Sequence, residues 1–299
     1  MKNKIEYYYK LINISLYEKN HKYMFYYNGN RYMYFICNRN INELNEIYML
    51  LSGNNKYHKI VLNINKEVLT FIDNKPYILV QLHNYHDKEL INIKDFCFFQ
   101  KIDVNKYSFL NRGDWYNLWC KKIDYIIYQR KHINQKYLIL DQYLDYYIGL
   151  SENAISYFKD TITKLKPSNN DQYVLTHRRI SSMYKLDFYN VDNLIIDHPS
   201  RNISEYFKYI FFYDEVDYSL VSLIIKNLNF SSYGYRLLFC RMLFPSYFFD
   251  IYESIVNDKI DEKKIDRLVL KVNDYERFLS FIYQEINKKT KIPSIDWIS

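Results

Sequence analysis

The chain has 299 residues, of which 48% are apolar, 19% aromatic and 25% charged. This length and mix predict a folded protein with a sizeable core, and they exclude wholly disordered and collagen-like chains. Only five residues are glycine and five are proline, which argues against β-sandwiches and propellers because those folds need many turn residues.

The net charge is +7, from 41 Lys and Arg against 34 Asp and Glu. The basic residues form no block, and they alternate with aromatic ones throughout because Lys, Asn, Ile and Tyr are all abundant and all have A/T-rich codons. This favours a solvated mixed surface over nucleic-acid binding. No stretch reaches the roughly 18 apolar residues of a membrane helix. We therefore expect a cytoplasmic protein with no membrane span, in which the four separate cysteines are reduced.

The first 84 residues predict a small antiparallel sheet with one helix. Asn28-Gly29-Asn30 lies between two β-prone runs, and an Asn-Gly pair in that place is the strongest short-range hairpin signal. In residues 42–51 the apolar positions change to helical spacing, with Asn42 as the expected cap. The expected strands are 23–27, 31–37, 59–64, 68–72 and 77–82, with turn residues 73–76 between the last two.

From residue 85 onward the pattern becomes helical. A clear helix signal follows Asp114, the expected cap of residues 114–131. The other expected helices are 88–100, 141–163, 204–212, 218–227, 233–250 and 260–290, with short irregular and extended pieces over 171–197. We predict a β-rich lobe over 1–84 and a mostly helical lobe over 85–299. This α+β order, a small sheet lobe before a large helical lobe, is typical of protein-kinase-like two-lobe folds.

Residues 175–208 come closest to a catalytic motif. A phosphotransferase needs an acid after a histidine to orient the acceptor hydroxyl, then an asparagine for a metal, then an aspartate after a short apolar strand for Mg²⁺. Asp197 directly follows the apolar run 194–196 and is the candidate Mg²⁺ ligand. The alternatives for Asp197 are a loop cap and an ion pair with Arg201.

The catalytic base is missing from this pattern. His177 is followed by Arg178 and Arg179, where small-molecule kinases have Gly and Asp, and Tyr184 stands where the asparagine is expected. A guanidinium cannot accept a proton at neutral pH. We therefore interpret 177–179 as a degenerate catalytic turn, in which His177 holds the loop backbone.

The nucleotide-binding side departs from the kinase pattern as well. None of the five glycines belongs to a Gly-rich phosphate loop. Arg31 and Arg39 bracket the strand on which kinases place their phosphate-pairing Lys. Glu43 stands where the ion-pair Glu would lie, and we interpret Glu43 and Glu46 as exposed acids of a helix face. His83 lies near the predicted hinge, where a nucleotide base would dock. Arg31, Arg39, Glu43 and His83 are thus the candidate residues of a nucleotide cleft.

Several segments of the second lobe carry a family resemblance. Residues 196–201 read Ile-Asp-His-Pro-Ser-Arg, and residues 292–298 read Ile-Pro-Ser-Ile-Asp-Trp-Ile. With these motifs and segments 115–128, 146–155 and 274–278, the chain resembles the CotS/YutH type of spore-coat-associated, kinase-like proteins over roughly residues 110–299. The resemblance implies a protein-kinase-like fold related to aminoglycoside and choline phosphotransferases. The chain departs from the family pattern with Asn202, where Asp is expected, and with the arginine pair 178–179.

Three hypotheses of function follow. The leading one is a catalytically impaired kinase-like protein of a low-GC Gram-positive bacterium, a scaffold for protein partners such as coat proteins, in the cytoplasm, the forespore or the spore coat. The second is an active ATP- and Mg²⁺-dependent small-molecule phosphotransferase, in which Asp187 or Asp192 serves as a displaced acid. The third and weakest is a nucleic-acid binder.

Overall fold

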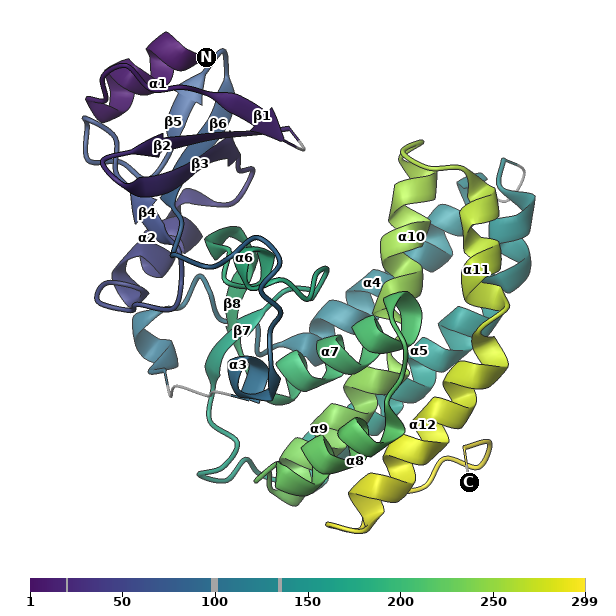
Figure 1. Cartoon of the computed structure of the whole chain (residues 1–299). Helices are drawn as coiled ribbons and strands as arrows, with labels where there is room; N and C mark the ends of the chain where they lie inside the picture. Colours follow the sequence, from purple (N-terminus) through teal and green to yellow (C-terminus); the bar gives the residue numbers. More distant parts are fainter. Residues whose placement is uncertain (20, 98–101, 134–135, 299) are drawn as a thin grey trace. The chain divides into compact units, whose positions relative to one another are not determined.

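The computed structural model describes all residues except 20, 98–101, 134–135 and 299. The chain divides into two units. The first consists of residues 1–98, 103–111 and 175–196, and the second of residues 99–102, 112–174 and 197–299. The first holds an antiparallel sheet and the second is helical (Figure 1), which confirms the expected α+β class. The predicted lobe boundary after residue 84 stays a prediction.

The first unit is built around a six-stranded antiparallel sheet. Its strands pair in the order β1-β2-β3-β6-β4, and β5 also pairs with β6. Two helices accompany the sheet, α1 (Lys2–Tyr9) and α2 (Ile41–Leu50). The strands are β1 (Tyr17–Lys19), β2 (Lys22–Tyr27), β3 (Asn30–Ile36), β4 (Lys59–Val61), β5 (Thr70–Ile72) and β6 (Lys75–Gln81).

The predicted hairpin around Asn28-Gly29 is confirmed. Tyr27 pairs with Asn30 across the β2–β3 ladder. Asn28 has a φ of 48° and Gly29 a φ of 75°, the positive values that a type I′ hairpin turn requires. This turn fixes the register of the two strands at the centre of the unit.

Two details of the predicted first lobe are wrong. The cap of α2 is Asn40 and not Asn42, because the Asn40 side chain accepts a hydrogen bond from the Asn42 backbone N–H. The turn between β5 and β6 contains only Asp73 and Asn74, with φ of 51° and 60°. Pro76 already belongs to β6, where its carbonyl oxygen accepts from the Cys37 N–H at 2.9 Å.

Helix α1 has no counterpart among the predicted elements. Its Ile5 and Tyr9 are buried and pack with Phe25 and Tyr34 of the sheet. The Tyr9 hydroxyl lies 2.9 Å from the Thr70 hydroxyl. An eight-residue helix that buries two side chains leaves almost no periodic signal in the sequence, because both the apolar spacing and the caps need more turns to stand out.

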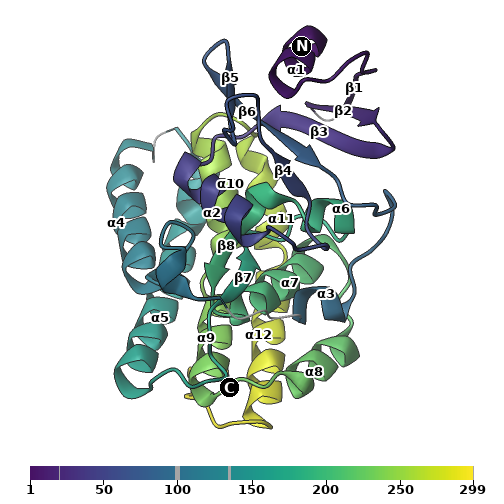
Figure 2. The same cartoon turned by 90° about the vertical axis from the view of Figure 1, so that its left-hand side faces the viewer.

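The second unit contains the long helices. Helix α5 packs against α4 and α9, α9 also against α7, and α12 against α8 and α9 (Figures 1 and 2). The helices are α4 (Trp115–Ile133), α5 (Leu138–Lys164), α7 (Ser200–Tyr213), α8 (Tyr218–Asn227), α9 (Ser232–Leu243), α10 (Ser246–Val256), α11 (Asp266–Val269) and α12 (Val272–Asn287), with the 3-10 turn η3 (Glu262–Ile265) before α11. In the described part of the chain, none of the helices combines the length and the apolar character that crossing a membrane requires.

Three of the predicted helices are divided or much shortened in the structure. The helix expected over 233–250 is two helices, because Pro245 lacks the N–H that a continuous helix needs. The stretch 260–290 is divided into η3, α11 and α12. Of the helix expected over 88–100, only α3 (Ile93–Cys97) is present, and residues 98–100 lie outside the described part.

Residues 174–197 form short pieces, as expected. Strands β7 (Val174–His177) and β8 (Leu194–Asp197) pair with each other. Between them lie the one-turn helix α6 (Lys185–Phe188) and the 3-10 turn η2 (Val191–Asn193). The 3-10 turn η1 (Val104–Lys106) follows α3 along the chain. All three are too short for periodicity to reveal.

His58 gives the first unit a predicted acid sensitivity. It is fully buried, its Nδ1 accepts from the His83 backbone N–H at 3.0 Å, and its Nε2 lies 2.8 Å from the Leu186 carbonyl oxygen. Burial lowers the pKa of His58 from 6.5 to about 4. The folded state thus favours the neutral ring, so its stabilisation is complete above pH 6.5 and is lost as the pH falls toward 4, up to about 3 kcal/mol. Urea unfolding at pH 7 and pH 5 should show this loss in the wild type and a smaller one in His58→Gln. An equal loss in both proteins would contradict the assignment.

Candidate functional site

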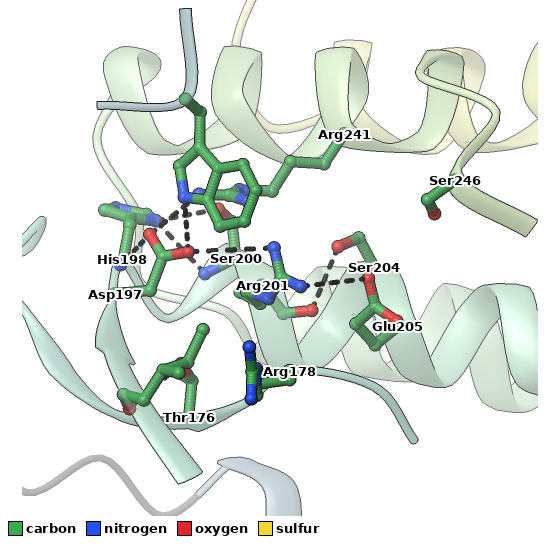
Figure 3. Close-up of polar contacts among 12 residues, drawn as sticks. Thr176, Arg178, Asp197, His198, Ser200, Arg201, Ser204, Glu205, Arg241 and Ser246 are labelled. Carbon is green, nitrogen blue, oxygen red and sulfur yellow. Dashed lines mark hydrogen bonds and ion pairs between the residues drawn. The ribbon is translucent and has the colours of Figure 1, made fainter. Parts of the chain in front are cut away.

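Asp197, the candidate Mg²⁺ ligand, ends β8 and is only 1% exposed. Its Oδ1 accepts from Arg241 Nη2 at 2.7 Å and from the His198 backbone N–H at 2.6 Å. Its Oδ2 accepts from the Trp115 indole Nε1–H at 2.7 Å. Figure 3 shows the Asp197 carboxylate beside His198 and Arg241, with its polar contacts as dashed lines. Both oxygens are therefore engaged by side chains or backbone of the second unit.

Two guanidinium groups neutralise this carboxylate. Arg241 forms the close ion pair, and Arg201 Nη1 lies 3.9 Å from Oδ2. Arg201 also pairs with Glu205 at 3.8 Å, as its (i, i+4) spacing predicts. Both guanidinium groups lie over the Trp115 ring, at 4.4 Å for Arg201 and 5.2 Å for Arg241. Two cations, two carboxylates and one aromatic ring thus form a buried, balanced cluster, which we call the Asp197 cluster.

This cluster does not fit a magnesium ion. Mg²⁺ needs carboxylate oxygens together with water or phosphate oxygens in an octahedral arrangement. Here the Asp197 oxygens face N–H donors, and a divalent cation beside them would be repelled by Arg201 and Arg241. Within the described residues, no group of three or more His, Cys, Asp or Glu side chains could hold a metal ion. Of the uses predicted for Asp197, the geometry therefore matches the ion pair with Arg201, supplemented by Arg241.

The residues after Asp197 form a second buried hub around Asp171. His198 Nδ1 accepts from the Ser200 backbone N–H at 3.0 Å, and its Nε2 lies 3.4 Å from Asp171 Oδ1. Asp171 also accepts from the Ser168 N–H at 2.7 Å and from the Ser231 hydroxyl. Burial alone would raise the pKa of Asp171, but these hydrogen bonds outweigh it and lower that pKa well below its usual range. Burial lowers the pKa of His198, so this ring stays neutral and rigidly oriented.

His177 is buried at the end of β7. Its Nε2 lies 2.8 Å from the Phe188 carbonyl oxygen, and its ring packs on the Phe188 ring with centroids 4.0 Å apart. These contacts match a residue that holds loop backbone. The partner of His177 Nε2 is thus the Phe188 carbonyl oxygen and not the hydroxyl of an acceptor substrate.

Asn193 holds the arginine turn, a role that the sequence analysis missed. The Arg178 N–H donates to the Asn193 carbonyl oxygen at 2.8 Å, and the Arg179 N–H donates to Asn193 Oδ1 at 3.2 Å. The Asn193 amide also donates to the Arg179 carbonyl oxygen. The guanidinium Nη1 of Arg179 donates to the Arg178 carbonyl oxygen at 3.0 Å. An asparagine that pairs a turn with a segment 14 residues away gives no local sequence signal.

Arg39 and Glu43 form a buried pair, with Arg39 Nε 2.6 Å from a Glu43 carboxylate oxygen. Arg39 also donates through Nη1 to the Asp192 carbonyl oxygen at 2.9 Å and through Nη2 to that of Leu194. The interpretation of Glu43 and Glu46 as exposed acids is wrong. Both are buried, and Glu46 accepts from the Leu110 backbone N–H at 2.9 Å. Burial is tolerated because each carboxylate has a cation or an amide as its partner.

Among the other candidate residues, Asp192 adjoins this pair, because its carbonyl oxygen accepts from Arg39. Arg31 forms an ion pair with Asp87. His83 is packed beside Tyr85, with ring centroids 4.6 Å apart. Asp187 is exposed on α6. Asp192 belongs to η2, and burial raises the pKa of its carboxyl group despite the opposing effect of the nearby cations Lys22 and Arg39.

Comparison with known proteins identifies the family and the fold of this chain. The sequence profile of the family described as "Spore coat putative kinase YutH" matches residues 2–282. The endospore coat-associated protein YutH of Bacillus subtilis (strain 168) is 28% identical over 212 residues, which are 62% of this chain and 61% of that relative, so the match spans less than two thirds of its length. An aminoglycoside phosphotransferase from Alicyclobacillus acidocaldarius subsp. acidocaldarius DSM 446 superposes with a TM-score of 0.63 at 12% identity over 92% of both chains. That structural match shows a kinase-like phosphotransferase fold. The profile match covers nearly the whole chain, and the chain therefore belongs to the YutH family of spore-coat kinase-like proteins.

Proposed function

We propose that this chain is a catalytically impaired member of its kinase-like family that acts as a scaffold for protein partners. The observation that carries the proposal is the closed Asp197 cluster. Both carboxylate oxygens of the aspartate that a phosphotransferase would use for Mg²⁺ accept hydrogen bonds, from Arg241, from Trp115 and from a backbone amide. A carboxylate held in this way stabilises the helical unit, and its charge is already balanced by arginine instead of a phosphate-bound metal.

The catalytic turn supports the same proposal. Arg178 and Arg179 occupy the place of a catalytic acid, and Asn193 binds both of their backbone amides. A guanidinium cannot take a proton from an acceptor hydroxyl. The turn is well ordered by hydrogen bonds but carries no base.

The name of the Bacillus subtilis relative supports the choice of partners. That protein is described as endospore coat-associated. We infer that the present chain likewise binds coat proteins, in the mother-cell or forespore cytoplasm or in the coat itself. A fluorescent fusion produced in a sporulating host should form a ring around the forespore, and the Asp187→Asn/Asp192→Asn variant should form the same ring if phosphate transfer is not required.

A thermal-shift titration tests the catalytic half of the proposal. Purified protein is heated with ATP, GTP or ADP, with and without Mg²⁺. A ligand specific for the native state would add about 2.7 kcal/mol of stability at a hundredfold excess over its dissociation constant. We expect no Mg²⁺-dependent shift for any of the three nucleotides.

The active phosphotransferase is the second candidate, favoured by the raised pKa of Asp192. A raised carboxyl pKa brings a side chain closer to the range useful for proton transfer. A Mg²⁺-dependent thermal shift that Asp197→Asn abolishes would establish this candidate in place of the scaffold. Loss of phosphate transfer in Asp192→Asn but not in Asp187→Asn would then identify the acid.

A further inference from the structure

The outward face of α4 carries a continuous stripe of exposed residues. Leu118, Tyr125 and Tyr128 are 43%, 55% and 62% exposed. Exposed polar residues lie between and beyond them, so that this side of the helix has large apolar side chains around a central Lys121 and polar groups at its two ends. The stripe, which we call the α4 stripe, consists of Asp114, Leu118, Lys121, Tyr125, Tyr128 and His132.

This stripe is not part of the core of the second unit. The opposite side of α4 buries Trp119, Ile123 and Ile126, and α4 packs along α5 (Figure 2). Arg130, at the flank, is held by ion pairs to Asp141 and to a second acid of α5. The inward side and the flank of α4 are therefore satisfied within the unit, and the outward side presents three large apolar side chains to solvent, which marks it as an interaction surface.

The spacing of the α4 stripe is the same when read in either direction. Its positions are separated by 4, 3, 4, 3 and 4 residues, the alternation that keeps side chains on one line of a helix packed against another helix. Reversing the order maps Asp114 on His132, Leu118 on Tyr128 and Lys121 on Tyr125. An antiparallel second copy of the helix would therefore meet this one in register along the whole stripe.

Each of these pairs is chemically complementary. Asp114 meets the His132 imidazole, whose ring N–H can donate to a carboxylate. Leu118 meets an aromatic ring, and Lys121 meets the Tyr125 ring in a cation–π contact. Because a two-fold axis repeats each contact, six pairs are formed over a length of about 27 Å. Tyrosine at the centre and charge at the rim is the composition of protein interfaces.

We propose that the α4 stripe is a self-association surface, on which two copies of this chain pack their α4 helices antiparallel around a two-fold axis. The Leu118, Tyr125 and Tyr128 side chains of the two copies bury one another, and the polar ends fix the register. The proposal is independent of the catalytic state of the protein. A dimer joined through α4 would carry two copies of every other binding surface of the chain and would therefore be a bivalent scaffold.

Sedimentation velocity and light scattering over a concentration series test the surface. The wild type should shift from 36.9 kDa at low concentration to twice that mass at high concentration. Tyr125→Asp/Tyr128→Asp should remain at 36.9 kDa throughout, because two buried carboxylates would face the partner helix. The matched control is Tyr26→Asp/Tyr213→Asp, which changes two equally exposed tyrosines away from α4 and should dimerise like the wild type.

A charge exchange tests the antiparallel register. Asp114→Lys alone places a cation opposite His132, and His132→Asp alone places an acid opposite Asp114. Each single variant should raise the dissociation constant of the dimer by roughly tenfold, because it makes a contact at the rim of the interface unfavourable. The double variant should restore it, because exchange of the two residues leaves each pair with opposite charge.

Circular dichroism separates these results from unfolding, since Asp114 also accepts from the Asn117 side-chain amide at 2.8 Å. A wild type that stays monomeric at every concentration would overturn the proposal. So would a dimer that persists in the folded Tyr125→Asp/Tyr128→Asp variant, or that the control pair disrupts to the same extent. Failure of the exchange to restore the dimer would exclude the antiparallel register.

Discussion

Asp197→Ala is expected to lower the free energy of unfolding by about 3–5 kcal/mol, the usual cost of removing one partner from a buried ion pair. The change leaves Arg241 buried without the carboxylate that it pairs with and removes the acceptor of the Trp115 indole N–H. A buried donor without an acceptor and a buried cation without its counter-charge both raise the free energy of the folded state. Urea unfolding at pH 7, followed by circular dichroism, measures the loss.

A matched control separates burial from charge. Asp145 is also paired with an arginine, Arg130, but its side chain is 76% exposed. Asp145→Ala should leave the unfolding curve nearly unchanged, because exposed pairs are screened by water. Adding Arg241→Met to Asp197→Leu should recover much of the lost stability, since an apolar pair of similar volume often replaces a buried ion pair without loss. An Asp197→Ala variant as stable as the wild type would show that the carboxylate reaches solvent and that the cluster is open.

The sequence identified Asp197 and a candidate pair with Arg201, but not the other partners of this carboxylate. An aspartate after a short apolar strand is a local pattern, and 194–197 displays it directly. Its partners Trp115 and Arg241 lie 82 and 44 residues away in the chain. Neither position carries a feature that distinguishes it from other aromatic or basic residues. One sequence therefore reveals the ligand candidate and leaves its neutralisation to the structure.

The first lobe shows the same limit. The Asn28-Gly29 turn was predictable because positive φ at two consecutive residues selects for those residue types. Glu43 and Glu46 were misjudged because charged residues on a helix are usually solvated, and only the contacts with Arg39 and the Leu110 amide make their burial acceptable. A turn that selects particular residue types can be predicted from the sequence. The distant partners that make a buried charge acceptable cannot.

Gly234→Ala is expected to destabilise the second unit by about 1–3 kcal/mol, the range for overpacking a filled interior. A Cβ atom at Gly234 would lie 2.5 Å from Asp171 Oδ1, 2.9 Å from Phe230 Cβ and 3.0 Å from His198 Cε1. The Asp171 carboxylate cannot yield, because Ser168, Ser231 and His198 hold it. The methyl group must therefore push apart the hub that fixes His198 of the family motif.

Gly149→Ala is the matched control, because it makes the same chemical change inside a helix where a Cβ would meet nothing within 4 Å. Alanine at such a position should stabilise the protein by about 0.5–1 kcal/mol, since glycine loses more backbone entropy on folding. The two variants should therefore move the unfolding midpoint in urea in opposite directions. Equal effects would mean that space around Gly234 is not limiting, and the Asp171 hub would then not be the rigid support of the Asp-His-Pro-Ser-Arg segment that its contacts describe.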